Sequence, residues 1–199
     1  MVLRLTSLFA LLVLSLQSYS QEAEWLSGEL HLVNGSVKKG QVKIPQPTKS
    51  IRIGANKVAF RANKDAKTTR FKDHEIAFVY LTSRTDGTVK YVNIIVDKKL
   101  ALFREVETIG DLTIYARSMQ VNHASTVGVW FSSSFNEIYV QREGEKQASE
   151  LVSATRGLNY FRKNVNAYFS NCNSVVMASE PIEKKEDVLS ALQYYKNCI

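Results

Sequence analysis

Eleven basic side chains cluster between Lys38 and Lys72, a stretch in which Asp65 is the single acid. The whole chain has a formal net charge of +7, so the residues outside this stretch are net negative. A concentrated positive charge attracts polyanions such as lipopolysaccharide phosphates, acidic glycans or nucleic acids. We therefore predict an anion-binding surface that is formed by Lys38, Lys39, Lys43, Arg52, Lys57, Arg61, Lys64, Lys67, Arg70 and Lys72.

These cations also have a structural interpretation, because exposed lysines protect the edge strands of a sheet from pairing with other chains. Specific nucleic-acid binding is disfavoured, since such modules place aromatic side chains among their basic groups. Between Lys38 and Lys72 the only aromatic residues are Phe60 and Phe71, and we expect both in the core. The partner predicted from charge is an anionic polymer of the cell envelope, and another envelope protein is the alternative.

Sequence signatures of catalysis are missing. The chain has no Gly-x-Ser-x-Gly elbow, no His-Glu-x-x-His and no phosphate-binding glycine loop. A hydrolase of envelope glycan or peptide needs only two acids that meet in space. Glu105 and Glu107, at a spacing of two, are expected on one strand face. The acids nearest the predicted central strands are Asp73, Glu75, Glu105, Glu107 and Asp111. A non-enzymatic protein is the favoured hypothesis, and such a hydrolase is the alternative.

Cys172 and Cys198 are the only cysteines of the chain. An even pair in an exported protein predicts a disulfide, and the absence of a Cys-x-x-Cys spacing favours a structural role. Such a bond would close a loop of about 27 residues and stabilise the fold by roughly 3 to 4 kcal/mol on the chain-entropy model. The three histidines are scattered, so we predict no metal site and no cofactor.

The first 20 residues are typical of a signal peptide. Arg4 precedes an apolar run at residues 8–16, and Ser18 and Ser20 occupy the positions that a signal peptidase reads. The run is shorter than the roughly 20 apolar residues that span a bilayer. We therefore predict cleavage after Ser20, a mature chain without a transmembrane segment, and a periplasmic or secreted location.

From Glu29 to about Gln141 the hydrophobic pattern has a period of two, and the sequence contains eight or nine short strands joined by tight turns. Residues 21–145 therefore predict an antiparallel β domain, folded as a sandwich or a partial barrel. In its first hairpin, a two-residue Asn34-Gly35 turn would pair Leu30 with Lys39. Val42 would then point to the opposite face from Leu30, so we predict a bulge at Gly40.

The pattern changes to a helical spacing within residues 146–199. Leu158, Phe161 and Val165 lie on one face of a first helix, and Val188 and Leu192 on one face of a second. The predicted disulfide would join the ends of these helices. The fold class is therefore α+β, with a β-rich antiparallel domain followed by a C-terminal helical pair.

Two blocks near the C-terminus, FRKNVNAYFSNCNSVV and KKEDVLSALQYYKNC, resemble the carboxy-terminal segment of small uncharacterised exported proteins of Gram-negative bacteria. In those proteins an aromatic-rich helix ends at a cysteine. A helix that starts with Lys-Lys-acid-Asp then ends in Tyr-Tyr, a short spacer and a second cysteine. The resemblance covers residues 161–198 and implies a bacterial, exported protein, but it implies no activity.

Overall fold

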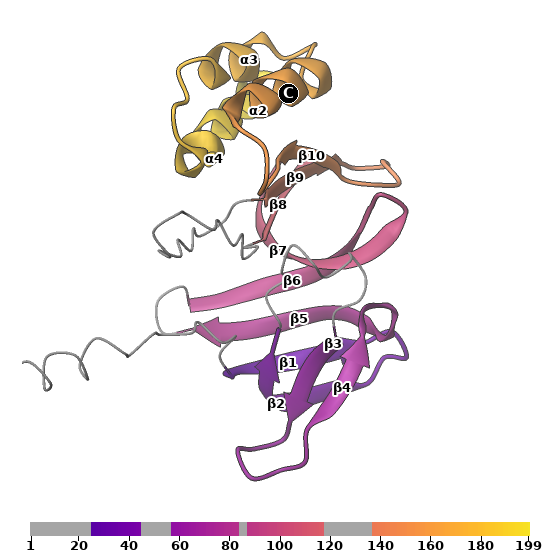
Figure 1. Cartoon of the computed structure of the whole chain (residues 1–199). Helices are drawn as coiled ribbons and strands as arrows, with labels where there is room; N and C mark the ends of the chain where they lie inside the picture. The colour runs from indigo at the N-terminus through magenta and orange to yellow at the C-terminus, as the bar shows by residue number, and fades with distance from the viewer. Residues whose placement is uncertain (1–24, 45–56, 84–86, 118–136) are drawn as a thin grey trace, which may run out of the picture.

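The computed structural model describes residues 25–44, 57–83, 87–117 and 137–199. In these residues ten antiparallel strands form one open sheet, and helices follow it at the C-terminal end (Figure 1). This arrangement confirms the predicted α+β class, with a β-rich sheet and a helical tail. The predicted signal peptide, residues 1–20, lies outside the described residues.

The strands are β1 (Leu26–Leu32), β2 (Val37–Lys43), β3 (Lys57–Arg61), β4 (Thr69–Lys72), β5 (Ile76–Ser83), β6 (Gly87–Val96), β7 (Lys99–Ile109), β8 (Leu112–Arg117), β9 (Glu137–Arg142) and β10 (Ser149–Val152). Their order across the sheet is β10-β9-β8-β7-β6-β5-β1-β2-β3-β4. Most neighbours are consecutive in the chain, as in a meander. The exception is β1, which lies between β2 and β5, and the 3-10 helix η1 (Asp73–Glu75) connects the edge strand β4 to β5.

The two faces of this sheet are buried differently along its width. Side chains alternate along a strand, so residues that pair across strands share a face. Face 1 carries Leu30 of β1 and, opposite it, Val79 of β5. Face 2 carries Glu29 and, opposite it, Tyr80. In β1 to β5, face 1 forms a core that contains Leu30, Val42, Val58, Phe71 and Val79.

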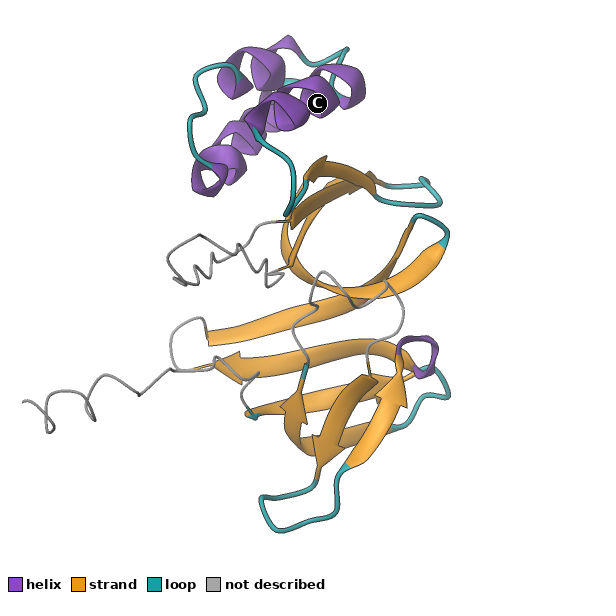
Figure 2. Cartoon of the chain, in the orientation of Figure 1, coloured by secondary structure: helices purple, strands orange, loops and turns teal. Residues whose placement is uncertain are grey.

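Around β8 and β9 both faces are covered. Face 1 of β8 and β9 packs against the helices, as Ile114 does against the cluster that contains Phe161 and Leu192. Face 2 forms a separate core that includes Phe103 and Tyr139. This part of the sheet curls strongly (Figure 2). The backbone N–H of Ala148, in the β9–β10 connection, reaches the carbonyl of Ile95 on β6 at 2.9 Å, which makes this half a partial barrel.

The register of the first hairpin differs from the predicted one. The N–H of Leu32 donates to the carbonyl of Ser36 at 2.9 Å, so the loop has three residues, and Gly35 has a φ of 83°. This loop places Lys38, and not Lys39, opposite Leu30. The predicted bulge at Gly40 is wrong. Gly40 pairs directly with Gly28, because the extra loop residue already returns Val42 to the face of Leu30.

Gly28 and Gly40 allow the sheet to coil tightly at β1 and β2. A Cβ atom at Gly28 would lie 2.3 Å from the carbonyl oxygen of Tyr80 on β5. A Cβ atom at Gly40 would lie 2.5 Å from the carbonyl oxygen of Arg61 on β3. Any larger residue at either position would push a neighbouring strand away, so these two glycines are required by the curvature.

The helical tail contains α2 (Leu158–Tyr168), α3 (Asn173–Ser179), η2 (Lys185–Asp187), α4 (Val188–Leu192) and η3 (Gln193–Asn197). The short helix α3 lies between the two helical segments that the sequence predicts. The predicted disulfide between Cys172 and Cys198 is present, with a Cα–Cα distance of 5.6 Å. Strand β10 precedes the helices within residues 146–199 and pairs with β9. Across the described ranges, no helix is long and apolar enough to cross a membrane.

Candidate functional site

Six of the ten predicted anion-binding residues lie on face 2 of β2, β3 and β4. The cross-strand pairs Gln41 with Arg61, Lys43 with Ala59, and Ala59 with Arg70 establish the shared face. Within these three strands, no acidic side chain is on this face. We call these residues the cationic face: Lys39, Lys43, Lys57, Arg61, Arg70 and Lys72.

The other four predicted residues lie elsewhere. Lys38 is opposite Leu30 and therefore belongs to face 1. Lys64 and Lys67 are exposed in the β3–β4 loop, next to the cationic face in the chain. Arg52 lies outside the described residues. The cationic face is thus smaller than the surface that the sequence predicts. Side chains alternate along the strands, so Lys38 points to the other face, and Lys64 and Lys67 lie in a loop.

The cationic face holds like charges close together. Lys57 and Lys72 are directly opposite each other on β3 and β4, and both are exposed. Like charges at such positions destabilise a sheet. Arg61 is fixed in place, since its Nε donates to Gln41 Oε1 at 2.7 Å and its guanidinium lies 4.2 Å above the ring of Trp25. Because β4 is an edge strand of the sheet, its cations also oppose pairing with other chains, so the cationic face suits both edge protection and the binding of an anion.

Three rings form a cluster on face 2 of β1 and β5, beside the cationic face. The rings of His31 and Phe78 are stacked with their centroids 4.1 Å apart. Tyr80 meets His31 edge-on at 5.8 Å and Phe78 at 5.4 Å. All three side chains are partly exposed. We call these residues the ring cluster.

Glu29 connects the ring cluster to the cationic face. Its Oε1 accepts from Lys39 Nζ at 2.7 Å, and its Oε2 lies 3.4 Å from His31 Nε2. The Lys39 hydrogen bond lowers the pKa of Glu29 below its usual range. On the other side of the ring cluster, Lys90 Nζ donates to Glu105 Oε2 at 2.9 Å. Face 2 therefore presents cations, rings and two carboxylates in one continuous strip across the sheet.

The ring cluster was not predicted from the sequence, because the pairing of β1 with β5 brings together residues almost fifty positions apart. Phe78 and Tyr80 alternate with Val79 in a strand that is apolar on both sides, and such a pattern is typical of a strand buried on both faces. The polar neighbours of the first strand, Glu29 and His31, were the signal that one of these faces is partly open.

The acids proposed for catalysis do not converge. A register shift in β7 places Glu105 opposite Tyr115 on face 2, and Glu107 opposite Ile114 on face 1. The expectation that both acids share one face is therefore wrong, because the irregularity adds a residue between them. Glu107 instead accepts from Gln193 of the helical tail.

The other three acids each have a structural position. Glu75 Oε2 accepts from the backbone N–H of Lys72 at 2.7 Å. Asp73 is 5% exposed, and burial raises the pKa of its carboxyl to about 6. Among the described residues, its Oδ1 and the Oδ1 of Asn93 are buried without a hydrogen-bond partner. Asn93 Nδ2 donates to the backbone carbonyl of Asp73, so these orphaned oxygens lie at the junction of β4, β5 and β6.

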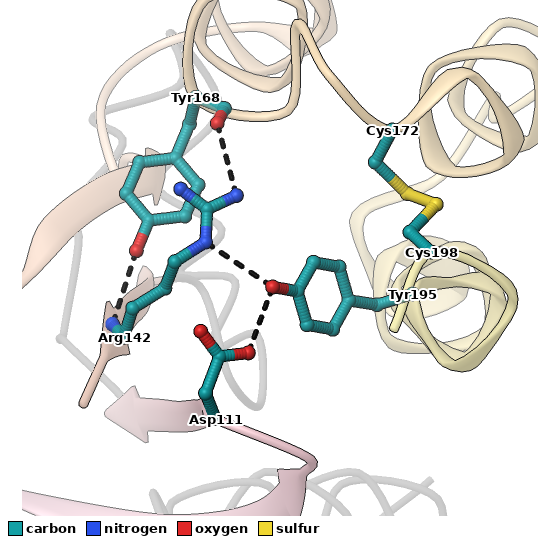
Figure 3. Close-up of a disulfide and its surroundings, with 6 residues drawn as sticks. All are labelled: Asp111, Arg142, Tyr168, Cys172, Tyr195 and Cys198. Carbon is teal, nitrogen blue, oxygen red and sulfur yellow. Dashed lines mark hydrogen bonds between the residues drawn. A yellow bond between two sulfur atoms is a disulfide. The ribbon is translucent and has the colours of Figure 1, made fainter.

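Asp111 lies in a surface pocket of about 330 Å³ at the β7–β8 and β9–β10 turns, with Glu145 nearby. Both acids are committed to structural hydrogen bonds. Tyr195 Oη donates to Asp111 at 2.8 Å, and Tyr168 Oη donates to Glu145 at 2.7 Å. Arg142 extends from β9 between these tyrosines and donates to Tyr195 Oη at 3.2 Å (Figure 3). The network attaches the helical tail to the sheet, next to the disulfide.

A buried ion pair occupies face 2 at the ends of β8 and β9. Arg117 donates to Glu137 Oε2 from Nε at 2.8 Å, and both side chains are almost fully buried. Burial raises the pKa of Glu137, and the Arg117 charge opposes this effect. The guanidinium of Arg117 also stacks 4.4 Å from the ring of Phe103. These contacts satisfy the pair internally and leave it closed to a ligand.

The histidines do not form a metal centre in the part of the chain that the structure describes, where no group of three or more histidine, cysteine or acidic residues could hold a metal ion. His74 is exposed at η1. No protein-family model matches the chain, and neither a curated protein nor a solved structure is detectably similar to it.

Proposed function

We propose that this chain is an exported, non-enzymatic binding protein of the Gram-negative cell envelope, which holds anionic polymers on the cationic face. The observation that carries the proposal is the set of six cations on one face of three adjacent strands, with Lys57 and Lys72 directly opposite each other. A bound polyanion would remove the repulsion between them and would gain from the release of its counterions.

Two further observations support an exported protein. The disulfide Cys172–Cys198 requires an oxidising compartment to persist. The sequence also begins with a segment typical of a signal peptide. The periplasm, or the space outside the cell, offers acidic glycans and the phosphates of lipopolysaccharide as partners for a cationic surface.

The test is binding to two soluble polyanions, polygalacturonate and linear polyphosphate, measured over a series of salt concentrations. The variant Lys57→Glu/Arg70→Glu/Lys72→Glu should lose affinity for both polymers. Its dependence of log K on log salt should also be shallower, by roughly one unit per cation removed.

A control with the same change in net charge separates this surface from the charge of the whole protein. Lys99, Lys146 and Lys163 are exposed residues of the second half of the chain. Their replacement by glutamate should leave both affinities within about twofold, because these positions are away from the cationic face. Equal losses in the two triple variants would refute the proposed surface.

The alternative function, a hydrolase of envelope glycan or peptide, has one favourable observation: the pocket that contains Asp111 and Glu145. Both carboxylates already accept from tyrosine hydroxyls that attach the helical tail. A hydrolase would need one of these acids to release its partner and act on a sugar or peptide bond. Loss of activity on peptidoglycan fragments in Glu145→Gln, with the fold unchanged, is the result that would support it.

A further inference from the structure

We propose that the ring cluster is a subsite for sugar rings, so that the anionic polymer is an acidic polysaccharide. This inference rests on the proposed function and adds the class of ligand to it. The ring cluster is His31, Phe78 and Tyr80 on face 2, and it is joined to the cationic face through Glu29 and Lys39. One extended chain can therefore contact rings and cations together.

The aromatic groups present an apolar surface of a kind that suits sugars. Their π faces carry negative charge density, which attracts the weakly positive C–H groups on one side of a pyranose ring. His31, Phe78 and Tyr80 all remain partly exposed although they pack against one another. No such surface is needed to hold a polymer that consists of phosphates alone.

The polar groups beside the rings distinguish sugars from phosphates. Glu29 and Glu105 flank the ring cluster, and their side chains are 37% and 29% exposed. A carboxylate accepts hydrogen bonds from sugar hydroxyls but repels a phosphate. Each acid is paired with a lysine, Glu29 with Lys39 and Glu105 with Lys90. A polysaccharide with spaced charges can place its hydroxyls at these pairs and its carboxylates at the cations of β3 and β4.

The stacking within the ring cluster limits how nucleic acid could bind. His31 and Phe78 are stacked on each other with an interplanar angle of 21° and a centroid distance of 4.1 Å, so no base can enter between them. The outer faces of the rings suit a sugar or a base alike, and the oligo(dT) probe below distinguishes the two.

The experiment compares three probes on the full exported chain: polygalacturonate, linear polyphosphate and oligo(dT), at one ionic strength. The variant His31→Leu/Tyr80→Leu keeps the apolar volume but removes two aromatic rings. We expect its affinity for polygalacturonate to fall about tenfold, the value of one good aromatic contact. Affinity for polyphosphate and oligo(dT) should stay within about twofold, which also shows that β1 and β5 are still paired.

The outcomes distinguish a failure of the proposed sugar subsite from a failure of the proposed function. Equal losses for polygalacturonate and polyphosphate, or no loss for either, would overturn the sugar subsite and leave the cationic face intact. A loss confined to oligo(dT) would overturn it in favour of nucleic acid. If the unmodified chain binds none of the three probes, the proposed function fails and the subsite with it.

A second variant protects the test against a folding failure of the first. Phe78→Leu is a milder change in the same cluster, and a severalfold loss for polygalacturonate alone is expected. The control Tyr194→Leu removes an aromatic ring that is 51% exposed on the helical tail, away from face 2. It should change none of the three affinities, and a loss in this control equal to that of Phe78→Leu would contradict the subsite.

Discussion

Around strands β8 and β9 both faces of the sheet are covered, whereas in strands β2 to β4 only face 1 is. In the second half of the chain, from β6 to the helical tail, two arginines have internal partners: Arg117 pairs with Glu137, and Arg142 donates to Tyr195. The first half leaves Lys57 and Lys72 exposed to solvent and opposite each other. Charged groups that pair internally stabilise the fold. The repulsion between Lys57 and Lys72, in contrast, is free energy that a bound anion can recover.

The buried ion pair of Arg117 with Glu137 is expected to contribute most to the stability of the second half. Arg117→Met should lower the free energy of unfolding by about 3 to 5 kcal/mol, because it leaves the carboxylate of Glu137 buried without a partner. Urea unfolding measures this loss. The double variant Arg117→Met/Glu137→Leu should recover most of it, since no buried charge then remains. A single variant as stable as the parent would show that the pair is dispensable.

Removal of the disulfide tests how far the helical tail depends on its covalent link. Cys172→Ala/Cys198→Ser should lower the free energy of unfolding by about 3 to 4 kcal/mol on the chain-entropy model, with a sequence separation of 26 residues between the cysteines. The cationic face should keep its affinity for polygalacturonate, because it lies in the other half. A joint loss of stability and binding at low denaturant would show that the halves are not independent.

Asp73 gives a pH dependence at the connection between β4 and β5. Its pKa is raised from 3.8 to about 6 by burial, so the folded state holds the proton more tightly than the unfolded state. The stabilisation that protonated Asp73 gives the folded state is complete below pH 3.8 and is lost as the pH rises through 6. The free energy of unfolding changes by about 3 kcal/mol at most over this range.

Asp73→Asn should remove this dependence, because an amide does not ionise. The variant should be more stable than the parent at pH 8 and similar to it at pH 4, as measured by thermal unfolding across this range. Glu75→Gln, a neighbouring carboxylate, is the control. If Asp73→Asn is destabilised equally at both pH values, the carboxylate makes a specific contact and is not merely desolvated.

Tyr195→Phe tests the attachment of the tail through a single oxygen. The variant removes the hydroxyl that donates to Asp111 and accepts from Arg142, while the ring remains in the core. The expected loss is about 1 to 2 kcal/mol, as for buried hydrogen bonds of a charged group. Tyr194→Phe, on the exposed neighbour, should change the free energy of unfolding by no more than a few tenths of a kcal/mol.

The smallest effect on stability is expected on the cationic face, and there the substitution should be stabilising. Lys72→Glu replaces a repulsive pair with an attractive one, so the free energy of unfolding should rise by about 0.2 to 1 kcal/mol. Polyphosphate affinity should fall at the same time. A variant that is more stable but binds less well would show that the cationic face is kept at the expense of stability, whereas reduced stability would contradict this interpretation.

Much of the fold followed from local patterns. The period of two between Glu29 and Gln141 indicated the antiparallel sheet, and the helical spacing of Leu158, Phe161 and Val165 indicated α2. The cysteine pair predicted the disulfide. The register of the first hairpin did not follow, because Asn34-Gly35 suits a two-residue and a three-residue loop alike, and only packing of Val42 on the face of Leu30 selects between them.

The candidate site was predictable in composition but not in shape. The charge bias between Lys38 and Lys72 is visible in the sequence, yet alternation along β2 removes Lys38 from the cationic face. The irregularity in β7 places Glu105 and Glu107 on opposite faces, and no residue in this stretch indicates the irregularity from the sequence. The register of a strand and the position of a bulge depend on contacts with the neighbouring strands, and these contacts exist only once the sheet has formed.

Residue type and short-range periodicity are enough to establish which residues are charged, where strands give way to helices, and which two cysteines can pair. The contact of His31 with Phe78 and Tyr80 depends on the pairing of β1 with β5, which three strands, β2 to β4, separate in the chain, so no local pattern specifies it. The ring cluster beside the cationic face exists because the long-range order of strands places β1 between β2 and β5.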